Sequence, residues 1–233
     1  MSEKTMKKIA HDPATPKGIL ICSVKAIAGL CIFAFGCHLI IQGNIGAAPW
    51  DVLNLGLSGT FGISYGCASI IVSLVIVCID MLMHESIGLG MFYDAILVGL
   101  AVDLYEFIGL IPMQENYFTG VIFTVAGVLL QGFSMYYYMS AGLGCGPRDT
   151  MLVGLSRRIK KVPIGAISIA ILSVVTLCGW LLGGKAGLGT LIGAFGTGPA
   201  MQMFFRIMHF DATGIKHQNI IGSLRVIAGK SKK

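Results

Sequence analysis

Six stretches of the chain are almost continuously apolar, and the polar residues are concentrated between them. Each stretch is about 20 residues long or more, which is the length that an α-helix needs to cross the ~30 Å hydrocarbon core of a bilayer. A helix in a soluble core would carry polar residues at every turn, and these stretches do not. The pattern therefore predicts six membrane-spanning helices. The predicted spans are 18–41, 63–83, 87–111, 117–140, 163–183 and 187–209.

Two connections between these spans, residues 42–62 and 141–162, are too short for domains and too apolar for ordinary loops. Each begins with glycines, passes through a proline and an aspartate, and continues as an apolar stretch of helical character. Proline fits best in the first turn of a helix, so we expect short helices to start at Pro49 and Pro147. We predict that these segments are re-entrant half-helices, which enter the bilayer without crossing it.

The same two segments match each other in register. The Gly, Pro and Asp of residues 46–51 recur at residues 144–149, 98 positions later, and Gly-Leu-Ser and Gly-Leu-Gly triplets follow in each copy. Apolar matches mean little in a membrane protein, but Pro, Asp and Gly coinciding at one register indicate a tandem duplication. We predict two repeats, 18–115 and 116–209, each with three spans and one Gly-Pro-Asp segment.

Three spans are an odd number, so the second repeat must enter the bilayer from the opposite side, and the predicted repeats are inverted in topology. The net charge of +6 supports an orientation, because basic residues gather in the leader 1–17, in residues 157–161 and in the tail 210–233. The positive-inside rule places these clusters and both termini in the cytoplasm. Asp51 then lies toward the outer side and Asp149 toward the cytoplasm. We expect the tail to form an amphipathic helix on the inner leaflet.

Composition removes several classes of protein. With 55% hydrophobic and only 12% charged residues, the chain is not a soluble globular domain. Its basic residues lie at the span ends and form no nucleic-acid face. The 7 cysteines show no spacing typical of a metal site, and the chain contains no nucleotide-binding, HExxH or GxSxG motif. We therefore expect no metal, no cofactor, no nucleic-acid partner and no enzymatic activity.

The aspartates of the repeated segments allow two interpretations. As structural groups, they satisfy free amides at the positive end of a helix dipole. As functional groups, they lie where two half-helices from opposite faces direct their polar ends to a shared site, as in inverted-repeat transporters. The two copies differ at matching positions, which suggests an asymmetric site. The candidate substrate-binding residues are Asn44, Trp50, Asp51, Asn54, Arg148 and Asp149.

Two charged residues need a separate comment. Arg148, at a glycine-rich helix start, suits either a carboxylate or phosphate of a substrate or the lipid headgroups at the cytoplasmic surface. Asp94 lies deep in the third span, where an ionisable residue is costly and often functional. It is our candidate for coupling protons or cations, and its alternative is a hydrogen bond to a neighbouring helix. Asp103, nine residues later, falls on the opposite face and is not expected to act with it.

Several of these features resemble one bacterial family. They are the two Gly-Pro-Asp segments, the Gly-x-Gly sequences at Gly88 and Gly187, residues 99–103 and the Lys-His pair at 216–217. Together they are similar to the YczE/YyaS/YitT-type integral membrane proteins, over residues 18–225. The resemblance implies a bacterial membrane topology and at most a transporter, and it supplies no substrate.

Our prediction is an all-α, six-span protein of the bacterial inner membrane with both termini in the cytoplasm. Its expected function is secondary transport of a small polar or charged solute, by alternating access between the inverted repeats. A passive channel and a non-transporting scaffold or accessory protein are the alternatives. The expected partners are the bilayer and the solute, and six spans are few enough to be compatible with a homodimer.

Overall fold

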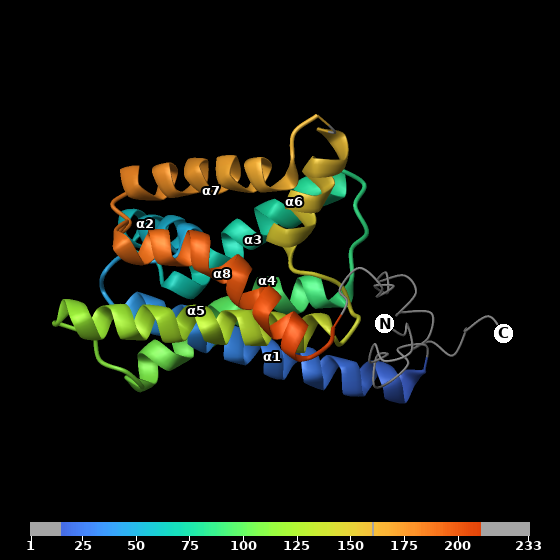
Figure 1. The fold of residues 1–233 in the computed structure, drawn as a ribbon, viewed down its shortest axis with the longest axis horizontal. Helices are drawn as coiled ribbons and strands as arrows, with labels where there is room; N and C mark the ends of the chain where they lie inside the picture. Colours follow the sequence, from blue (N-terminus) through green and yellow to red (C-terminus); the bar gives the residue numbers. More distant parts are fainter. Residues whose placement is uncertain (1–14, 160, 211–233) are drawn as a thin grey trace.

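A computed structural model describes residues 15–159 and 161–210. This part of the chain consists of eight helices joined by short connections, without strands (Figure 1). The helices are α1 (Pro16–Gln42), α2 (Pro49–Phe61), α3 (Tyr65–Leu82), α4 (Leu89–Ile108), α5 (Tyr117–Met139), α6 (Pro147–Arg158), α7 (Ile164–Leu181) and α8 (Leu188–Ile207). Residues 1–14 of the predicted basic leader and 211–233 of the predicted tail lie outside the described residues.

Four of the described helices, α1, α3, α5 and α7, are long and apolar enough to cross a membrane. Many of their large apolar side chains are exposed, as lipid-facing residues would be, and α7 is the extreme case, with only Ile167 and Gly179 buried. These helices confirm the prediction of an α-helical membrane protein. The remaining long helices, α4 and α8, contain 20 residues each.

The two Gly-Pro-Asp segments form short helices that start where the sequence predicts. Pro49 and Pro147 each occupy the first turn, and each helix is preceded by a residue in the extended conformation. With 13 and 12 residues, α2 and α6 are about 20 Å long at 1.5 Å per residue, which is too short to cross the hydrocarbon core.

The centre of the molecule is an antiparallel pair, α1 and α5, that packs through glycines. Gly36 lies against Gly127, and Gly43 against Gly120: a methyl group at Gly36 would stand 2.8 Å from the carbonyl oxygen of Gly127. Such an approach leaves no room for a side chain, and small residues at a helix contact are how membrane helices pack closely. The pair is therefore fixed in position by backbone contact.

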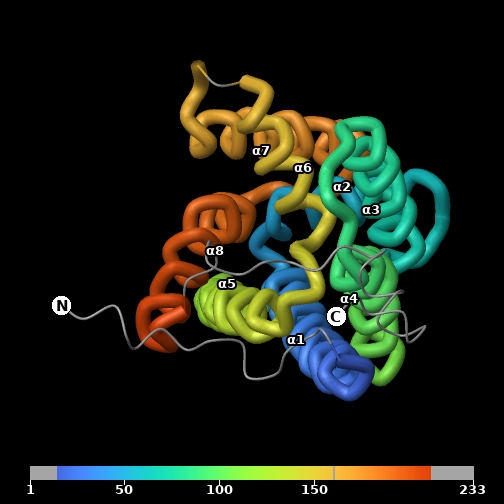
Figure 2. The backbone as a smooth tube through the Cα atoms, turned by 90° about the vertical axis from the view of Figure 1, so that its right-hand side faces the viewer, coloured from blue at the N-terminus to red at the C-terminus, as the bar shows by residue number. Residues whose placement is uncertain are grey.

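The other helices are arranged in pairs around this centre. Figure 2 shows α1, α4, α5 and α8 in one group and α2, α3, α6 and α7 in another. Within the first group, α4 packs on α1 and α8 packs on α5. Within the second, α2 packs on α7 and α6 packs on α3. These contacts of the first half thus have counterparts in the second half. The exception is α3, which also packs on α4, whereas α7 makes no comparable contact with α8.

The connections before the short helices also correspond. Gly46 and Gly144, 98 positions apart, have φ angles of 112° and 115°, a region in which side chains are strained. Two residues further on, each segment leads into its helix start. The amide of Gly90 donates to the carbonyl of Leu143, and the amide of Gly189 donates to that of Ile45, both at 2.9 Å. These bonds hold the starts of α4 and α8 against the opposite half of the molecule.

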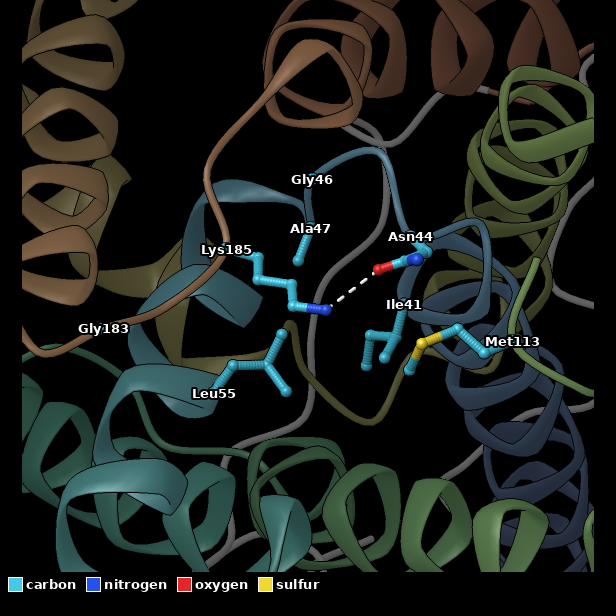
Figure 3. A pocket seen from close by; sticks show the side chains of 8 residues that line it. All are labelled: Ile41, Asn44, Gly46, Ala47, Leu55, Met113, Gly183 and Lys185. Atoms are coloured by element: carbon cyan, nitrogen blue, oxygen red, sulfur yellow. Dashed lines mark hydrogen bonds between the residues drawn. The ribbon is translucent and has the colours of Figure 1, made fainter. Parts of the chain in front are cut away.

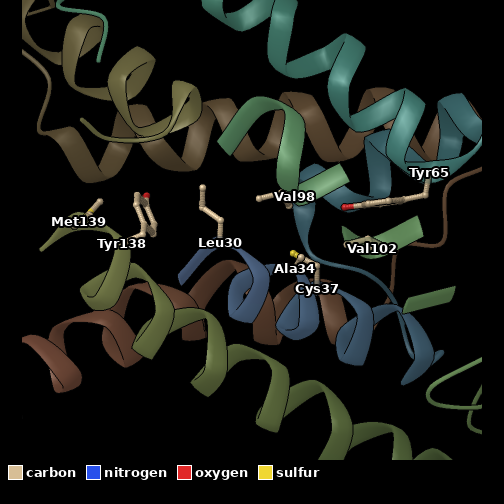
Figure 4. Packing of buried hydrophobic residues seen from close by; sticks show 8 residues of the cluster. All are labelled: Leu30, Ala34, Cys37, Tyr65, Val98, Val102, Tyr138 and Met139. Carbon is tan, nitrogen blue, oxygen red and sulfur yellow. The ribbon is translucent and has the colours of Figure 1, made fainter. Parts of the chain in front are cut away.

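A hydrophobic cluster of α1, α3, α4 and α5 supports the region around the short helices (Figure 4). Its side chains are mostly aliphatic, but it includes Tyr65 and Tyr138, which are 4% exposed each. A buried tyrosine normally needs a partner for its hydroxyl group. The partners are the two aspartates of the Gly-Pro-Asp segments.

Candidate functional site

A cavity of about 800 Å³ lies between the two groups of helices, and residues from all eight helices line it. The starts of α2 and α6 both reach it, with Trp50 and Asp51 from one and Arg148 and Asp149 from the other. Asp94 lines it from α4. Five of the seven residues that the sequence nominates are therefore brought together in one space.

Trp50 and Arg148 meet directly inside this cavity. The guanidinium carbon of Arg148 lies over the indole ring of Trp50, 5.0 Å from its centroid, a typical cation–π distance. These are matching positions of the two segments, 98 residues apart. The contact shows that the two short helices face each other at their N-terminal ends.

Asp51 is buried at the start of α2, and only one of its two carboxylate oxygens has a hydrogen-bond partner among the described residues. Its Oδ1 accepts a 2.7 Å hydrogen bond from the hydroxyl group of Tyr65. Its Oδ2 is buried without a hydrogen-bond partner in the part of the chain that the structure describes. Asn54, which does not line the cavity, donates through Nδ2 to the same tyrosine oxygen at 3.4 Å and acts on Asp51 only through Tyr65.

Asp149 has a similar arrangement with a donor from a different helix. Its Oδ2 accepts a 3.2 Å hydrogen bond from the hydroxyl group of Tyr138 on α5. Tyr65 and Tyr138 do not occupy matching positions, so the two aspartates are held in related but unequal ways. The sequence predicts an asymmetric site from the residues that differ between the two copies, and neither tyrosine is among those residues.

Asp94 lies beside the residue that precedes α6. A methyl group built on Gly146 would stand 2.5 Å from Oδ2 of Asp94, so only glycine leaves room for this carboxylate. Asp94 interacts electrostatically with Arg148 and Asp149. Asp103 does not share this space: its Oδ1 accepts from the amide of Gly66 at 2.7 Å, on α3.

The rim of the cavity carries a second charged group. Glu85, in the connection between α3 and α4, forms 3.1 Å ion pairs with Arg157 and with Arg158 at the end of α6. Arg158 also donates to the carbonyl of Met83. At the matching place of the other half, Thr60 donates to the carbonyl of Leu182 at 3.0 Å. Glu85 is not among the residues that the sequence nominates, because its partners Arg157 and Arg158 lie 72 and 73 residues away along the chain.

Asn44 does not join the other nominated residues. It borders a separate pocket of about 200 Å³, where its Oδ1 accepts a 2.9 Å hydrogen bond from Lys185 (Figure 3). Asn44 is exposed and has a positive φ of 56°, and the matching residue Gly142 has a φ of 73°. Asparagine tolerates this conformation better than most residues, so the backbone of the turn explains its presence.

Two further polar groups stand out that are not among the seven nominated residues. Gln131 on α5 lines the cavity and donates to the sulfur of Cys37 at 3.1 Å. Asp80 on α3 is 0% exposed, and neither of its carboxylate oxygens has a hydrogen-bond partner within the described residues. Among those residues no group of three or more His, Cys, Asp or Glu side chains could hold a metal ion.

Apolar helices long enough to cross a bilayer, packed around a cavity lined by charged side chains, define an α-helical membrane protein with an internal polar site. The chain belongs to the family of unknown function DUF6198, whose sequence profile matches residues 23–206.

The chain is also similar to individual bacterial proteins. It is 34% identical to the uncharacterized membrane protein YczE of Bacillus subtilis, over 75% of this chain and 81% of that protein. It is 31% identical to an uncharacterized protein of Haemophilus influenzae, over 77% and 81%, and 24% identical to YyaS of B. subtilis, over 78% and 92%. No solved structure matches the chain. The resemblance to YczE- and YyaS-type membrane proteins is confirmed.

Proposed function

We propose that the protein is a secondary transporter, which moves a small polar or charged solute across the bacterial inner membrane. The observation that carries this proposal is the cavity into which both short helices direct their charged N-terminal ends. Charged side chains among membrane helices are expensive, and they are typically retained where a solute or proton passes. A volume of about 800 Å³ is in the range of small-molecule sites.

Six spans in two inverted repeats are part of this proposal. At 1.5 Å per residue, the 20 residues of α4 and of α8 reach about 30 Å, so both helices are long enough to serve as the fifth and sixth spans. The antiparallel pairing of α1 with α5, and the matched turns at Gly46 and Gly144, support an inverted relation of the halves. Both termini then lie in the cytoplasm, as the basic clusters favour.

The contacts at the ends of the two short helices suit alternating access. The end of α6 is tied to the connection before α4 by Arg158, and the end of α2 is tied to the connection before α8 by Thr60. In an inverted-repeat transporter, equivalent contacts of this kind open and close the two sides of a fixed central site. Asp94, beside Arg148 and Asp149, is the proposed carboxylate for coupling to protons or cations.

Solute uptake into proteoliposomes tests the proposal. A panel of cationic, anionic and neutral solutes is measured with the intact protein and with Asp51→Asn and Asp149→Asn, under a pH gradient and a membrane potential. We expect saturable uptake of one solute class, and a loss of about tenfold or more in both variants. Glu106→Gln is the matched control, because Glu106 is an exposed acid on α4 outside the cavity.

Each remaining outcome selects an alternative. Flux that rises linearly with concentration, without saturation, would identify a passive channel. If no solute moves, and both variants fold and behave like the parent, transport is wrong and the non-transporting scaffold or accessory protein takes its place.

A further inference from the structure

We infer that the cavity binds a monovalent organic cation, and that protons leave its carboxylates when the cation enters. This inference rests on the proposed function and names its substrate class. It starts from the charges of the cavity. Three carboxylates, of Asp51, Asp94 and Asp149, surround one guanidinium, that of Arg148. When all are ionised, they leave an excess of two negative charges.

That excess is not relieved by other groups within the described residues. Glu85 and Arg157 line the cavity as well, but Glu85 is paired with both Arg157 and Arg158 at the rim, and none of these three charges acts on the aspartates of the cavity. The other titratable groups that face the carboxylates are Cys37 from α1, Tyr65 from α3, Tyr138 from α5 and Cys145 before α6, all neutral in their protonated forms. The parts of α7 and α8 that line the cavity carry no titratable side chain.

Uncompensated buried carboxylates are costly, so an empty cavity must hold protons on some of them. The Oδ2 of Asp51, which has no hydrogen-bond partner among the described residues, is a place where such a proton or a cation can bind. A cation that enters supplies this partner, and the protons it replaces leave to solvent. Cation binding is then coupled to proton release, and the net charge of the cavity stays nearly constant.

An anion is a poor occupant of the same space. Among the described residues, Arg148 carries the positive charge that acts on all three carboxylates, and its guanidinium is already stacked on Trp50. Every carboxylate that balances Arg148 would repel an incoming anion. The helix starts, which could attract an anion on their own, each carry an aspartate in the first turn.

The walls favour an organic cation over a metal ion. Phe33, Val98, Met135, Ile171 and Leu172 line the cavity beside the charged residues. These side chains provide no ligand for a metal ion, and no described cluster of three or more ligating residues exists. Apolar walls with a few charged groups instead suit a cation that carries hydrocarbon.

Tryptophan fluorescence provides a binding test in detergent. The chain contains two tryptophans, and Trp180 is 59% exposed on α7, away from the cavity. In the Trp180→Phe background, Trp50 alone reports on the site. Tetraethylammonium is the probe cation, and propanesulfonate and sodium ions are the comparisons. We expect saturable binding of tetraethylammonium, weak binding of sodium and none of propanesulfonate.

Two substitutions of opposite sign make the test decisive. Asp94→Asn removes a carboxylate and is expected to weaken tetraethylammonium binding by about tenfold. Arg148→Gln removes the competing positive charge and is expected to strengthen it several-fold. Glu106→Gln is expected to leave it within about twofold, because Glu106 lies outside the cavity. A substitution that merely disturbs the fold would weaken binding in every case, so the strengthening by Arg148→Gln is the informative result.

Proton release is measured with a pH indicator in weakly buffered solution. We expect the medium to acidify on addition of tetraethylammonium, and the affinity to rise with pH because the cation competes with protons. Propanesulfonate binding that is abolished by Arg148→Gln would overturn the inference, as would an absence of tetraethylammonium binding. If tetraethylammonium does not bind but the proteoliposomes take up an anion or a neutral solute, the cation inference is wrong and the proposed transport function stands. If tetraethylammonium binds but no solute is taken up, the transport function is wrong and the cation site stands.

Discussion

The hydroxyl group of Tyr65 joins two buried polar side chains, since it donates to Asp51 and accepts from Asn54. Asp51 is 2% and Asn54 0% exposed, so neither side chain is hydrated as it would be at the protein surface. A buried carboxylate without a donor costs much more than the net gain of one hydrogen bond. Tyr65 therefore determines whether α2 can keep its aspartate inside the protein.

Tyr65→Phe removes this donor and leaves both oxygens of Asp51 unsatisfied. We expect the free energy of unfolding to fall by about 1–3 kcal/mol, measured by thermal or denaturant unfolding in detergent. The double variant with Asp51→Asn is the control, because the neutral amide is less costly to leave unpaired. A double variant that loses the full sum of the two single losses would contradict a direct interaction.

Asp80 presents the opposite case, a buried carboxylate for which the described residues offer no donor. Asp80→Asn keeps the shape and removes the charge, so we expect the midpoint of thermal unfolding to stay or to rise. Asp103→Ala is the comparison and should lower it, because Asp103 accepts a hydrogen bond from Gly66. A clear drop for Asp80→Asn would mean that this carboxylate has a bound positive partner.

Sequence reasoning reached some of these residues and missed others for a physical reason. Proline and the aspartate after it are local signals of a helix start, so the prediction of α2 and α6 needed no knowledge of packing. Tyr65 and Tyr138 act across helices, and nothing in their neighbourhood along the chain distinguishes them from other tyrosines. Asn44 was nominated because it differs from its match, but its positive φ explains the choice of residue.

Among the elements, the pair α1 and α5 depends most strictly on glycine. At Gly36 and Gly127 an added methyl group would meet the carbonyl oxygen of the facing glycine, and a backbone atom cannot turn aside as the end of a side chain can. The short helices depend on glycine as well, because Gly146 is what leaves room for Asp94. Glycines are easy to see in a sequence, but which helix each one faces is decided only by the packing.

Gly36→Ala is expected to separate α1 from α5 and to lower the free energy of unfolding by about 1–3 kcal/mol. Gly198→Ala on α8 is the matched control: a methyl group there meets nothing within 4 Å, so alanine should be neutral or slightly stabilising. Both variants are compared by thermal unfolding in one detergent. If both variants change the unfolding temperature equally, helix propensity accounts for the effect of Gly36→Ala and the backbone contact does not.

For the whole molecule, the proposed function depends on two halves that run in opposite directions. The odd number of spans per repeat led to this prediction, and the antiparallel α1 and α5 are consistent with it. The sequence could not say that the two halves interlock. In the structure α2 packs on α7 and α6 on α3, so each short helix is held by the other half.

Labelling from the two sides of the membrane tests this topology. Single cysteines are placed at Gly59, at the end of α2, and at Lys161, after α6, in a variant whose seven native cysteines are replaced. Both positions are exposed. We expect a membrane-impermeant maleimide to reach Gly59→Cys only from outside and Lys161→Cys only from the cytoplasm. Labelling of both from the same face would reject inverted repeats.

The meeting of Trp50 with Arg148 has a consequence for how such a protein can arise. An ancestor built from two identical subunits would place one and the same residue on both sides of this contact. Two arginines would repel each other, and two tryptophans would leave the carboxylates without a balancing charge. Fusion of two copies into one chain lets the two sides diverge into a complementary pair. The exchanged variant Trp50→Arg with Arg148→Trp should then unfold at nearly the parental temperature, while either substitution alone should not.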